Sequence, residues 1–266
     1  MNNPQNILNQ FSLKGKTALM TGGAGLFGRQ IVAALAEAGA RTLIASRDVA
    51  ALETVAEGHR AQGCDVTALG LDQGDEASVI ALRDEVRTRY GCLDILVNNA
   101  VLRPMKSGYQ GDDAGATFAE SMQVNATGLF LITRAFGDLM AEQKSGSIIN
   151  IGSIQGMIGP EPAIYKGTNM NGWYPDYYFH KGGMINFTRF VGSYYGAHGV
   201  RCNCVSPGGF FNSQPEMFVR QYSEKTFLGR MAGDEDLKGI VVFLASDASA
   251  YITGANIPVD GGYTAK

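Results

Sequence analysis

The sequence lacks the features that mark membrane proteins and proteins that bind nucleic acid. No apolar run comes near the roughly 18 residues that a membrane helix needs. Lys and Arg number 22 against 25 Asp and Glu, so the formal net charge is −3. A chain without a basic surplus is poorly suited to bind nucleic acid through its surface charge. We therefore expect neither a membrane nor a nucleic acid among its partners.

Cysteine is also scarce. The four cysteines are Cys64, Cys92, Cys202 and Cys204, and the C-x-C pair lacks the second half of a zinc site. We expect Cys202 and Cys204 on one face of a strand, as small buried hydrophobes in a reducing compartment. The amino-terminal residues are polar and carry no apolar core followed by a cleavage site. These observations predict a cytoplasmic protein with no metal site.

Glycine is abundant, at 35 of 266 residues, and strand patterns alternate with helix patterns without a linker. Alternating β and α units build a parallel sheet with helices on both faces. We therefore predict an α/β fold, a Rossmann-type doubly wound sheet of about seven strands, in a single domain spanning 1–266. The predicted strands are 16–21, 41–45, 66–71, 93–97, 147–151, 200–205 and 256–259. The predicted helices are 28–37, 48–61, 75–90, 117–143, 176–197 and 234–245.

A glycine-rich segment, TGGAGLFG at 21–28, follows the first predicted strand and opens the first predicted helix. A dinucleotide fingerprint requires this context. The glycines permit a tight turn, and backbone N–H groups at the helix start attract a pyrophosphate. The simpler alternative is an ordinary strand–helix turn.

Coenzyme choice is read at the end of the second strand, where an acidic residue binds the ribose 2′-hydroxyl of NAD. Here Ser46 and Arg47 occupy that place. An uncharged residue followed by a guanidinium suits the 2′-phosphate of NADP. We favour NADP(H), while NAD(H) stays open. The alternative is that Arg47 is a solvated charge and Asp48 caps the next helix.

Three polar groups follow later strands or open the second long helix. They are Asn98-Asn99-Ala100, Gly152-Ser153 and Tyr177-x-x-x-Lys181. Tyr177 and Lys181 share a helix face because they are four residues apart. A nearby ammonium favours the phenolate, which adapts a tyrosine to acid–base work near neutrality. A hydroxyl such as that of Ser153 can donate to a carbonyl or alkoxide oxygen.

These pieces resemble, in order and along nearly the whole chain, the compact single-domain branch of the short-chain dehydrogenase/reductase family. The resemblance rests on TGGAGLFG at 21–28, Asp72, NNA at 98–100, Asn125 in VNATG, IINIGS at 148–153, YYFHK at 177–181, RCNCVSPGG at 201–209 and VDGG at 259–262. A weaker resemblance, in YKGTNM, is to members that act on sugars and sugar acids.

The resemblance implies a role for each matching position. Tyr177 would be the acid or base, Lys181 would bind the nicotinamide ribose, Ser153 would orient the carbonyl and Asn125 would hold a relay water. Contacts to the coenzyme would come from Gly22, Ala24, Gly25, Leu26, Phe27, Gly28, Ser46, Arg47, Asp72, Gln73, Asn99, Ala100, Val101, Pro207, Gly208, Phe210 and Asn212.

Some positions depart from the family pattern. Leu26 stands where this branch has its middle glycine, so we expect a locally altered loop. Asn212 stands where a threonine is common. Tyr177 follows Ser153 by 24 positions, nearly a dozen more than the family leads us to expect, which leaves a chance Tyr-Lys pair as an alternative. We expect His180 at a helix surface or an interface, and His59 and His198 at helix surfaces.

The extra length lies in 160–176, which must pass over the cleft. Tyr165, Trp173, Tyr174, Lys166, Asn169 and Asn171 in this insertion suit a polyhydroxylated ligand, or else its aromatic residues fasten the loop or a subunit contact. Segment 207–227 is expected to form a mobile lid with Phe210, Phe211 and Phe218 facing the ligand.

The two long helices are where family members form oligomers, so we expect a homotetramer. Phe187, Phe190, Tyr194 and Tyr195 suit such an interface, or alternatively face the sheet. The leading hypothesis is an NADP-preferring dehydrogenase that interconverts a secondary alcohol and a ketone of a small molecule, a polyol, sugar or sugar acid. The alternatives are an NAD-linked catabolic dehydrogenase and a coenzyme-binding protein with little catalysis.

Overall fold

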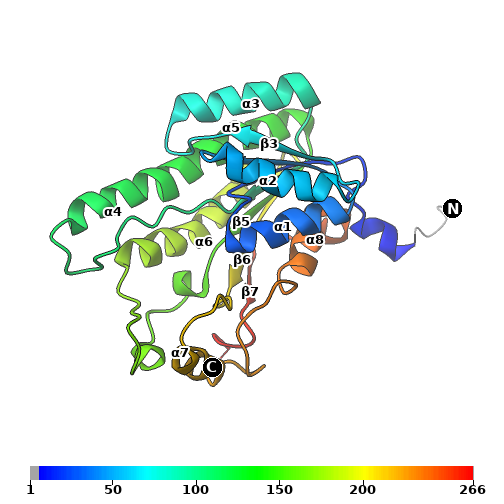
Figure 1. The fold of residues 1–266 in the computed structure, drawn as a ribbon. Helices are drawn as coiled ribbons and strands as arrows, with labels where there is room; N and C mark the ends of the chain where they lie inside the picture. Colours follow the sequence, from blue (N-terminus) through cyan, green and yellow to red (C-terminus); the bar gives the residue numbers. More distant parts are fainter. Residues whose placement is uncertain (1–5, 266) are drawn as a thin grey trace.

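A sheet of seven parallel strands forms the centre of the molecule, in the computed structural model that describes residues 6–265. The strand order is β3-β2-β1-β4-β5-β6-β7 (Figure 1). The strands are β1 Thr17–Thr21, β2 Arg41–Ser46, β3 Val66–Gly70, β4 Ile95–Asn98, β5 Gly146–Ile151, β6 Val200–Pro207 and β7 Asn256–Val259. The predicted doubly wound parallel sheet is confirmed.

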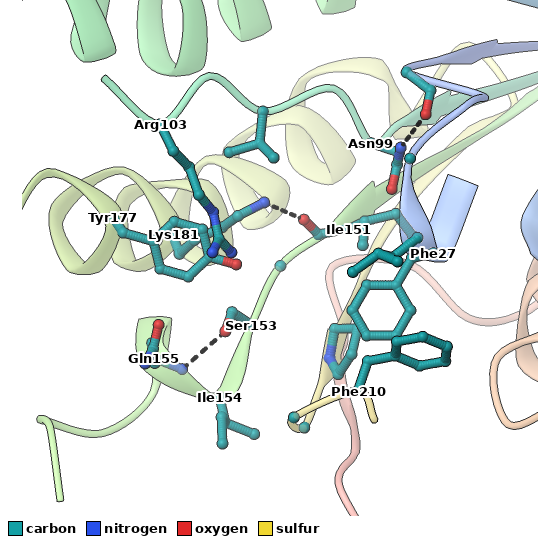
Figure 2. Close-up of a pocket in the computed structure, with 18 of the residues that line it drawn as sticks. Phe27, Asn99, Arg103, Ile151, Ser153, Ile154, Gln155, Tyr177, Lys181 and Phe210 are labelled. Carbon is teal, nitrogen blue, oxygen red and sulfur yellow. Dashed lines mark hydrogen bonds between the residues drawn. The ribbon is translucent and has the colours of Figure 1, made fainter. Parts of the chain in front are cut away.

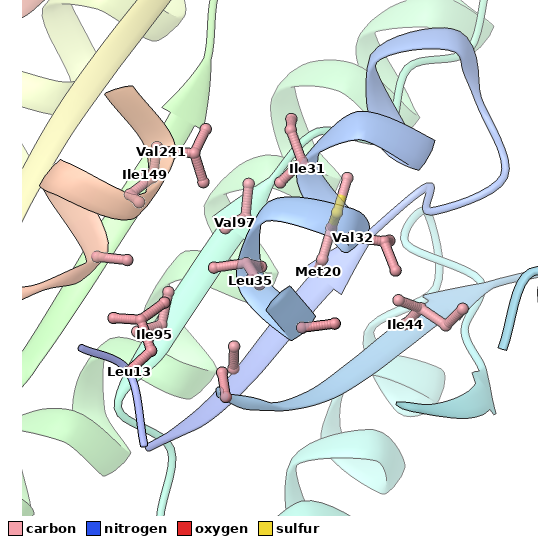
Figure 3. Packing of buried hydrophobic residues seen from close by; sticks show 14 of the residues in the cluster. Leu13, Met20, Ile31, Val32, Leu35, Ile44, Ile95, Val97, Ile149 and Val241 are labelled. Atoms are coloured by element: carbon pink, nitrogen blue, oxygen red, sulfur yellow. The ribbon is translucent and has the colours of Figure 1, made fainter. Parts of the chain in front are cut away.

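Helices cover both faces of this sheet (Figure 1). In chain order the helices are α1 Leu26–Glu37, α2 Val49–Arg60, α3 Glu76–Tyr90, α4 Ala114–Met122, α5 Gly128–Gln143, α6 Pro175–Gly196, α7 Glu216–Ser223 and α8 Lys238–Ala245. One apolar core joins the sheet to α1, α2 and α8 through residues such as Leu35, Leu52 and Val241. Figure 3 labels Leu35 and Val241 within this core. The other core joins the sheet to α3, α5 and α6 through Leu82, Phe136, Val191 and their neighbours. Helices α4 and α7 contribute no residue to the two cores against the sheet.

Local signals explain where several helices begin and end. Asp48 caps α2 by accepting a hydrogen bond from the Ala51 amide at 3.0 Å. Asp75 caps α3 in the same way through Ala77. Gly91 ends α3 with a φ of 77°, a value that glycine adopts without strain. The cap assigned to Asp48 as an alternative from the sequence is therefore present.

Two regions differ from the predicted elements. The helix predicted over 117–143 is interrupted by a wider π-helical segment, Gln123–Thr127, between α4 and α5. Helix α7 lies within the segment predicted only as a lid. Its two buried residues, Phe218 and Tyr222, have helical spacing, but a helix of eight residues provides only this one pair as a signal.

The cysteines of β6, Cys202 and Cys204, are buried, as predicted, whereas Cys64 and Cys92 are half-buried. All four cysteines are free. Within residues 6–265, no cluster of potential metal ligands is found. No helix in the same described part of the chain is long and apolar enough to cross a membrane.

Candidate active site

A cavity of about 730 Å³ opens at the carboxyl ends of the central strands. In the sheet order the chain switches direction between β1 and β4, and a crevice forms at such a switch point. The loops that follow β1, β4, β5 and β6 all contribute to its lining. The predicted site residues that line it are Gly22, Ala24, Gly25, Leu26, Phe27, Gly28, Ser46, Arg47, Asp72, Gln73, Asn99, Ala100, Val101, Ser153, Tyr177, Lys181, Pro207, Gly208 and Phe210.

The glycine loop turns sharply at Gly22, whose φ is 74°. A Cβ placed on Gly28 would lie 2.3 Å from the carbonyl oxygen of Gly22, so this helix position requires glycine. A Cβ on Gly25 would meet nothing closer than 3.5 Å. Leu26 is the first residue of α1 and adopts no positive φ, so leucine fits this position without backbone strain. Its side chain is 51% exposed and lines the cavity.

Asn99 fastens the loop after β4 to the glycine loop. Its Nδ2 donates to the carbonyl oxygens of Thr21 and Gly22, each at 3.0 Å. The amides of Asn99 and Ala100 donate in turn to the Thr21 hydroxyl. The NNA segment therefore fixes the shape of the crevice as well as lining it.

The end of β2 presents a cation to the cavity. Arg47 is exposed, lines the cavity and has no ion-pair partner within residues 6–265. The Ser46 hydroxyl donates to the carbonyl oxygen of Asp48 at 3.2 Å. Because the Asp48 carboxylate caps α2, it is already engaged.

Ser153, Tyr177 and Lys181 converge at the other end of the cavity (Figure 2). Lys181 is buried, and its Nζ donates to the Ile151 carbonyl at the end of β5 and lies 5.7 Å from the centre of the Tyr177 ring. Ser153 accepts a hydrogen bond from the Gln155 amide at 3.1 Å. The additional residues between Ser153 and Tyr177 thus leave the two side chains together, which argues against a chance motif.

The electrostatics of this end favour ionisation of Tyr177. Burial by itself raises the pKa of the phenol, but the charges of Lys181 and Arg103 oppose it, as do hydrogen bonds from Ser153 and Arg103. The net result is a pKa below the ordinary value of 10. For Lys181, burial lowers the pKa of the ammonium, and the neighbouring Tyr177 partly offsets this effect. The tyrosine is therefore suited to exchange a proton at lower pH than a free phenol.

Arg103 was not predicted from the sequence. Its guanidinium carbon lies 4.3 Å from the centre of the Tyr177 ring, and Figure 2 shows it reaching down from the loop after β4. A single arginine five residues after a strand forms no sequence motif that would predict a role in the site. Only its neighbourhood with Tyr177 in the folded chain identifies it.

Asn125 does not line the cavity. It is buried in the π-helical segment, where its Oδ1 accepts from the Leu102 amide at 2.8 Å and its Nδ2 donates to the Leu102 carbonyl at 2.7 Å. Its Nδ2 also donates to the Ser121 hydroxyl at 2.9 Å. The side chain therefore positions the loop that carries Arg103.

The prediction for His180 is wrong. His180 is 3% exposed, lies edge-on to Tyr177 with ring centres 5.2 Å apart, and has no hydrogen-bond partner on either ring nitrogen. Burial, with the charges of Lys181 and Arg103, lowers its pKa to about 3, so the ring is neutral at physiological pH. The helix surface was expected there, but α6 is enclosed on this side. His198 is exposed as predicted, but it lies in the turn after α6, and His59 is half-buried.

The aromatic and amide groups of the insertion do not all reach the cavity. Tyr165 lines it, together with Ile164 and Met170. Trp173 is 52% exposed, and the cavity lining includes none of Lys166, Asn169, Asn171, Trp173 and Tyr174. The insertion instead packs on the segment containing α7.

That packing joins the insertion to the expected lid. Ile164 and Phe218 belong to one apolar cluster with Tyr222 and Tyr263. Glu161 also pairs with Lys225 at 3.1 Å. Tyr165 lies against Phe218 with ring centres 5.5 Å apart. This residue therefore fits the alternative in which the aromatic residues of the insertion fasten the loop.

Within 207–227, two of the three predicted phenylalanines line the cavity. Phe210 packs edge-on against Phe27 at 5.4 Å (Figure 2), and Phe218 closes the side near α7. Phe211 is 51% exposed and turns away. Asn212 is exposed and lies outside the lining, where its amide donates to Gln214 at 2.7 Å.

The proposed interface residues of α6 separate into two groups. Phe190 and Tyr194 are 59% and 62% exposed and stack on each other. Tyr195 is buried and donates from its hydroxyl to Asp138 at 2.7 Å. For Tyr195 the alternative of facing inward is therefore correct.

The sheet order and the crevice define a Rossmann-like α/β protein, and comparisons with known proteins agree. A family model described as enoyl-(acyl carrier protein) reductase matches residues 24–264. Galactitol 2-dehydrogenase (L-tagatose-forming) of Cereibacter sphaeroides is 32% identical over 262 residues, 96% of this chain and 97% of that protein. The 3-oxoacyl-(acyl-carrier-protein) reductase of Pseudomonas aeruginosa is 31% identical over 257 residues, 94% and 98% of the two chains.

Comparison with a solved structure also supports this assignment. The gluconate 5-dehydrogenase from Burkholderia cenocepacia, in complex with NADP and tartrate, has a TM-score of 0.85 at 30% identity and covers 98% of this chain and 100% of its own. The chain belongs to the short-chain dehydrogenase/reductase family. It is an NAD(P)-dependent oxidoreductase that acts on alcohols and ketones.

Proposed function

We propose that this protein reversibly oxidises a secondary alcohol of a polyol, sugar or sugar acid to the ketone, with NADP as the preferred coenzyme. The observation that carries the proposal is the meeting of Ser153, Tyr177 and Lys181 in one cavity, with a lowered pKa at Tyr177. Retention of this whole set argues against a coenzyme-binding protein with little catalysis.

In the proposed mechanism Ser153 donates a hydrogen bond to the substrate oxygen. During oxidation the ionised Tyr177 accepts the hydroxyl proton, and during reduction its hydroxyl returns a proton to the developing alkoxide. The ammonium of Lys181 stabilises the phenolate and would hold the nicotinamide ribose. When bound, the nicotinamide supplies the acceptor or donor of hydride.

The residues of the crevice fit a dinucleotide. Backbone N–H groups at the start of α1 lack intrahelical acceptors and suit a pyrophosphate. The requirement for glycine at Gly28 keeps this turn tight. Asp72 and Gln73, after β3, line the cavity and would contact the adenosine half.

The preference for NADP rests on the end of β2. Arg47 is an unpaired cation at the cavity, while the Asp48 carboxylate is engaged as a helix cap. A guanidinium offers paired donors to a phosphate and gives no such advantage to a ribose hydroxyl. The relative from Burkholderia cenocepacia contains NADP. An NAD-linked catabolic dehydrogenase is the second candidate, and it would need Asp48 to leave its cap.

The substrate class rests on the relatives and on the lining. Relatives are named for galactitol, gluconate and acyl-carrier-protein substrates. Ser153, Gln155 and Tyr178 provide polar groups at the substrate end, and the Tyr178 hydroxyl is buried without a partner. Such groups suit a ligand with several hydroxyls. We also propose a homotetramer, because Phe190 and Tyr194 expose a stacked aromatic pair on a long helix.

Calorimetric titrations with NADPH and NADH, followed by a screen of polyols, sugar acids and ketones, test the proposal. We expect NADPH to bind at least about tenfold more tightly, which corresponds to 1.4 kcal/mol. We also expect coenzyme-dependent turnover of at least one polyhydroxylated substrate. Tighter binding of NADH would contradict the coenzyme assignment. Coenzyme binding without turnover of any alcohol or ketone would favour the coenzyme-binding alternative.

A further inference from the structure

We propose that Arg103 is the anchor for a carboxylate of the substrate, so that this site selects hydroxy acids over neutral polyols. This inference rests on the proposed function and narrows its substrate class. Arg103 lines the same end of the cavity as Tyr177 and Ser153. A ligand with its reacting oxygen at Ser153 and Tyr177 therefore extends within reach of the guanidinium.

The backbone next to Arg103 is held in place. Leu102, its neighbour, gives both its amide and its carbonyl to the side chain of Asn125. Asn125 is buried and is itself fixed by Ser121, whose hydroxyl donates to the buried Asp176 carboxylate at 2.6 Å. The loop therefore presents Arg103 from a rigid support, as a recognition residue needs.

Among residues 6–265 no carboxylate pairs with the Arg103 guanidinium. Two carboxylates line the cavity, those of Asp72 and Glu161, and neither forms an ion pair with Arg103. Glu161 pairs with Lys225 at 3.1 Å. Asp72 accepts from the Gly74 amide and follows β3, three strand spacings or about 14 Å from β4.

The substrate end is consequently positive. Arg103 and Lys181 are its two cations, Ser153, Gln155 and Tyr178 are neutral, and the lining carboxylate of the insertion, Glu161, is paired with Lys225. An arginine without a counter-ion, beside neutral donors, matches a carboxylate because its fork of N–H groups pairs with two oxygens. A neutral polyol offers this guanidinium no anionic group to bind.

Arg103 also touches Tyr177, with 4.3 Å between the guanidinium carbon and the ring centre. A residue that served only the tyrosine would affect acids and polyols equally. A carboxylate anchor affects the acid alone. This difference makes matched substrate pairs the appropriate test.

The experiment measures kcat/KM at saturating coenzyme for three acid and polyol pairs. Gluconate and glucitol, and galactonate and galactitol, differ at one end, whereas tartrate and threitol differ at both. The variants are Arg103→Met, Arg103→Lys and the control Lys106→Met. Lys106 is exposed in the same loop and outside the cavity lining. Calorimetry with tartrate, on protein saturated with NADP, gives a readout that does not depend on turnover.

We expect the wild type to prefer the acid, and Arg103→Met to lower the acid-to-polyol ratio by about 10- to 100-fold. Arg103→Lys should fall between the two, and Lys106→Met should match the wild type. A wild type that prefers polyols, or an equal loss for acid and polyol in Arg103→Met, would overturn the proposal.

Failure of the proposed function gives a different result. In that case the wild type turns over no member of any pair, and the tartrate titration decides. Binding that Arg103→Met weakens at least about tenfold would support the carboxylate anchor without the activity. Absent binding, or binding equal in the two proteins, would overturn it.

Discussion

Asn125 holds the backbone of Leu102 through both of its polar groups, accepting from the amide at 2.8 Å and donating to the carbonyl at 2.7 Å. This link joins the π-helical segment to the loop after β4. Through Ser121 it continues to Asp176, the residue before Tyr177. The arrangement gives Asn125 a positioning role at both sides of the substrate end.

Replacing Asn125 with Leu should loosen this loop. The substitution leaves the amide and carbonyl of Leu102 without their partners, so we expect a loss of about 1–3 kcal/mol in the free energy of unfolding. Hydrogen exchange at the Leu102 amide should become faster. Thr127→Ala, at an exposed residue of the same segment, is the control and should leave this exchange unchanged. Unaltered exchange in Asn125→Leu would contradict the positioning role.

Gly25, the N-cap residue of α1, and Gly28, inside α1, should differ sharply in their tolerance of substitution. Gly28→Ala places a Cβ 2.3 Å from the Gly22 carbonyl oxygen and must displace the loop, whereas Gly25→Ala meets that oxygen at 3.5 Å. We expect Gly28→Ala to lower Tm by several degrees and Gly25→Ala to cost less than about 1 kcal/mol as a change of N-cap. Thermal unfolding without coenzyme measures both. Equal Tm values for the two variants would refute this reading.

Arg47→Ala should weaken NADPH binding by about 10- to 100-fold, because the 2′-phosphate loses a charged donor. NADH binding should be nearly unchanged, since NADH lacks that phosphate. Calorimetric titration with both coenzymes provides the comparison, and added salt should reduce the difference. Equal losses for NADPH and NADH would remove Arg47 from the specificity argument.

The pH dependence of oxidation should follow Tyr177. The phenolate is the active base, and its pKa lies below 10 despite burial, because Lys181 and Arg103 favour the ionised form. kcat/KM for oxidation should therefore rise with pH through a midpoint below 10. Removing a cation favours the protonated phenol, so Arg103→Met should move the midpoint to higher pH. An unchanged midpoint in this variant would mean that the Arg103 charge does not act on Tyr177.

Much of the fold could be predicted from sequence because the local signals are strong. Buried strands such as β1 and β4 are short apolar runs that end at glycine or asparagine, and Asp48 and Asp75 mark helix starts. The Tyr177–Lys181 pair could be predicted for the same reason, since helical spacing fixes its geometry. Helix α7 could not, because its contacts are made mainly with the distant insertion and carboxyl-terminal residues.

The parts of the site that were missed depend on contacts between distant segments. Arg103 meets Tyr177 only because β4 and α6 lie near each other in the folded chain. His180 was expected at the surface, and tertiary packing around α6 buries it. Trp173 was expected near the ligand because the insertion is rich in aromatic and amide residues, but its side chain is exposed and lies outside the cavity lining. Residue type and spacing do not predict toward which distant segment each of these side chains points.

Tyr177 is proposed to transfer the proton in an alcohol–ketone reaction. The most direct test of this role is Tyr177→Phe, with kcat/KM for the best substrate and the coenzyme Kd measured on the same preparation. We expect a loss of about 10²- to 10⁴-fold in kcat/KM, the contribution of a positioned acid–base group, with the coenzyme Kd nearly unchanged. A variant that keeps activity within about threefold of the wild type would contradict the account.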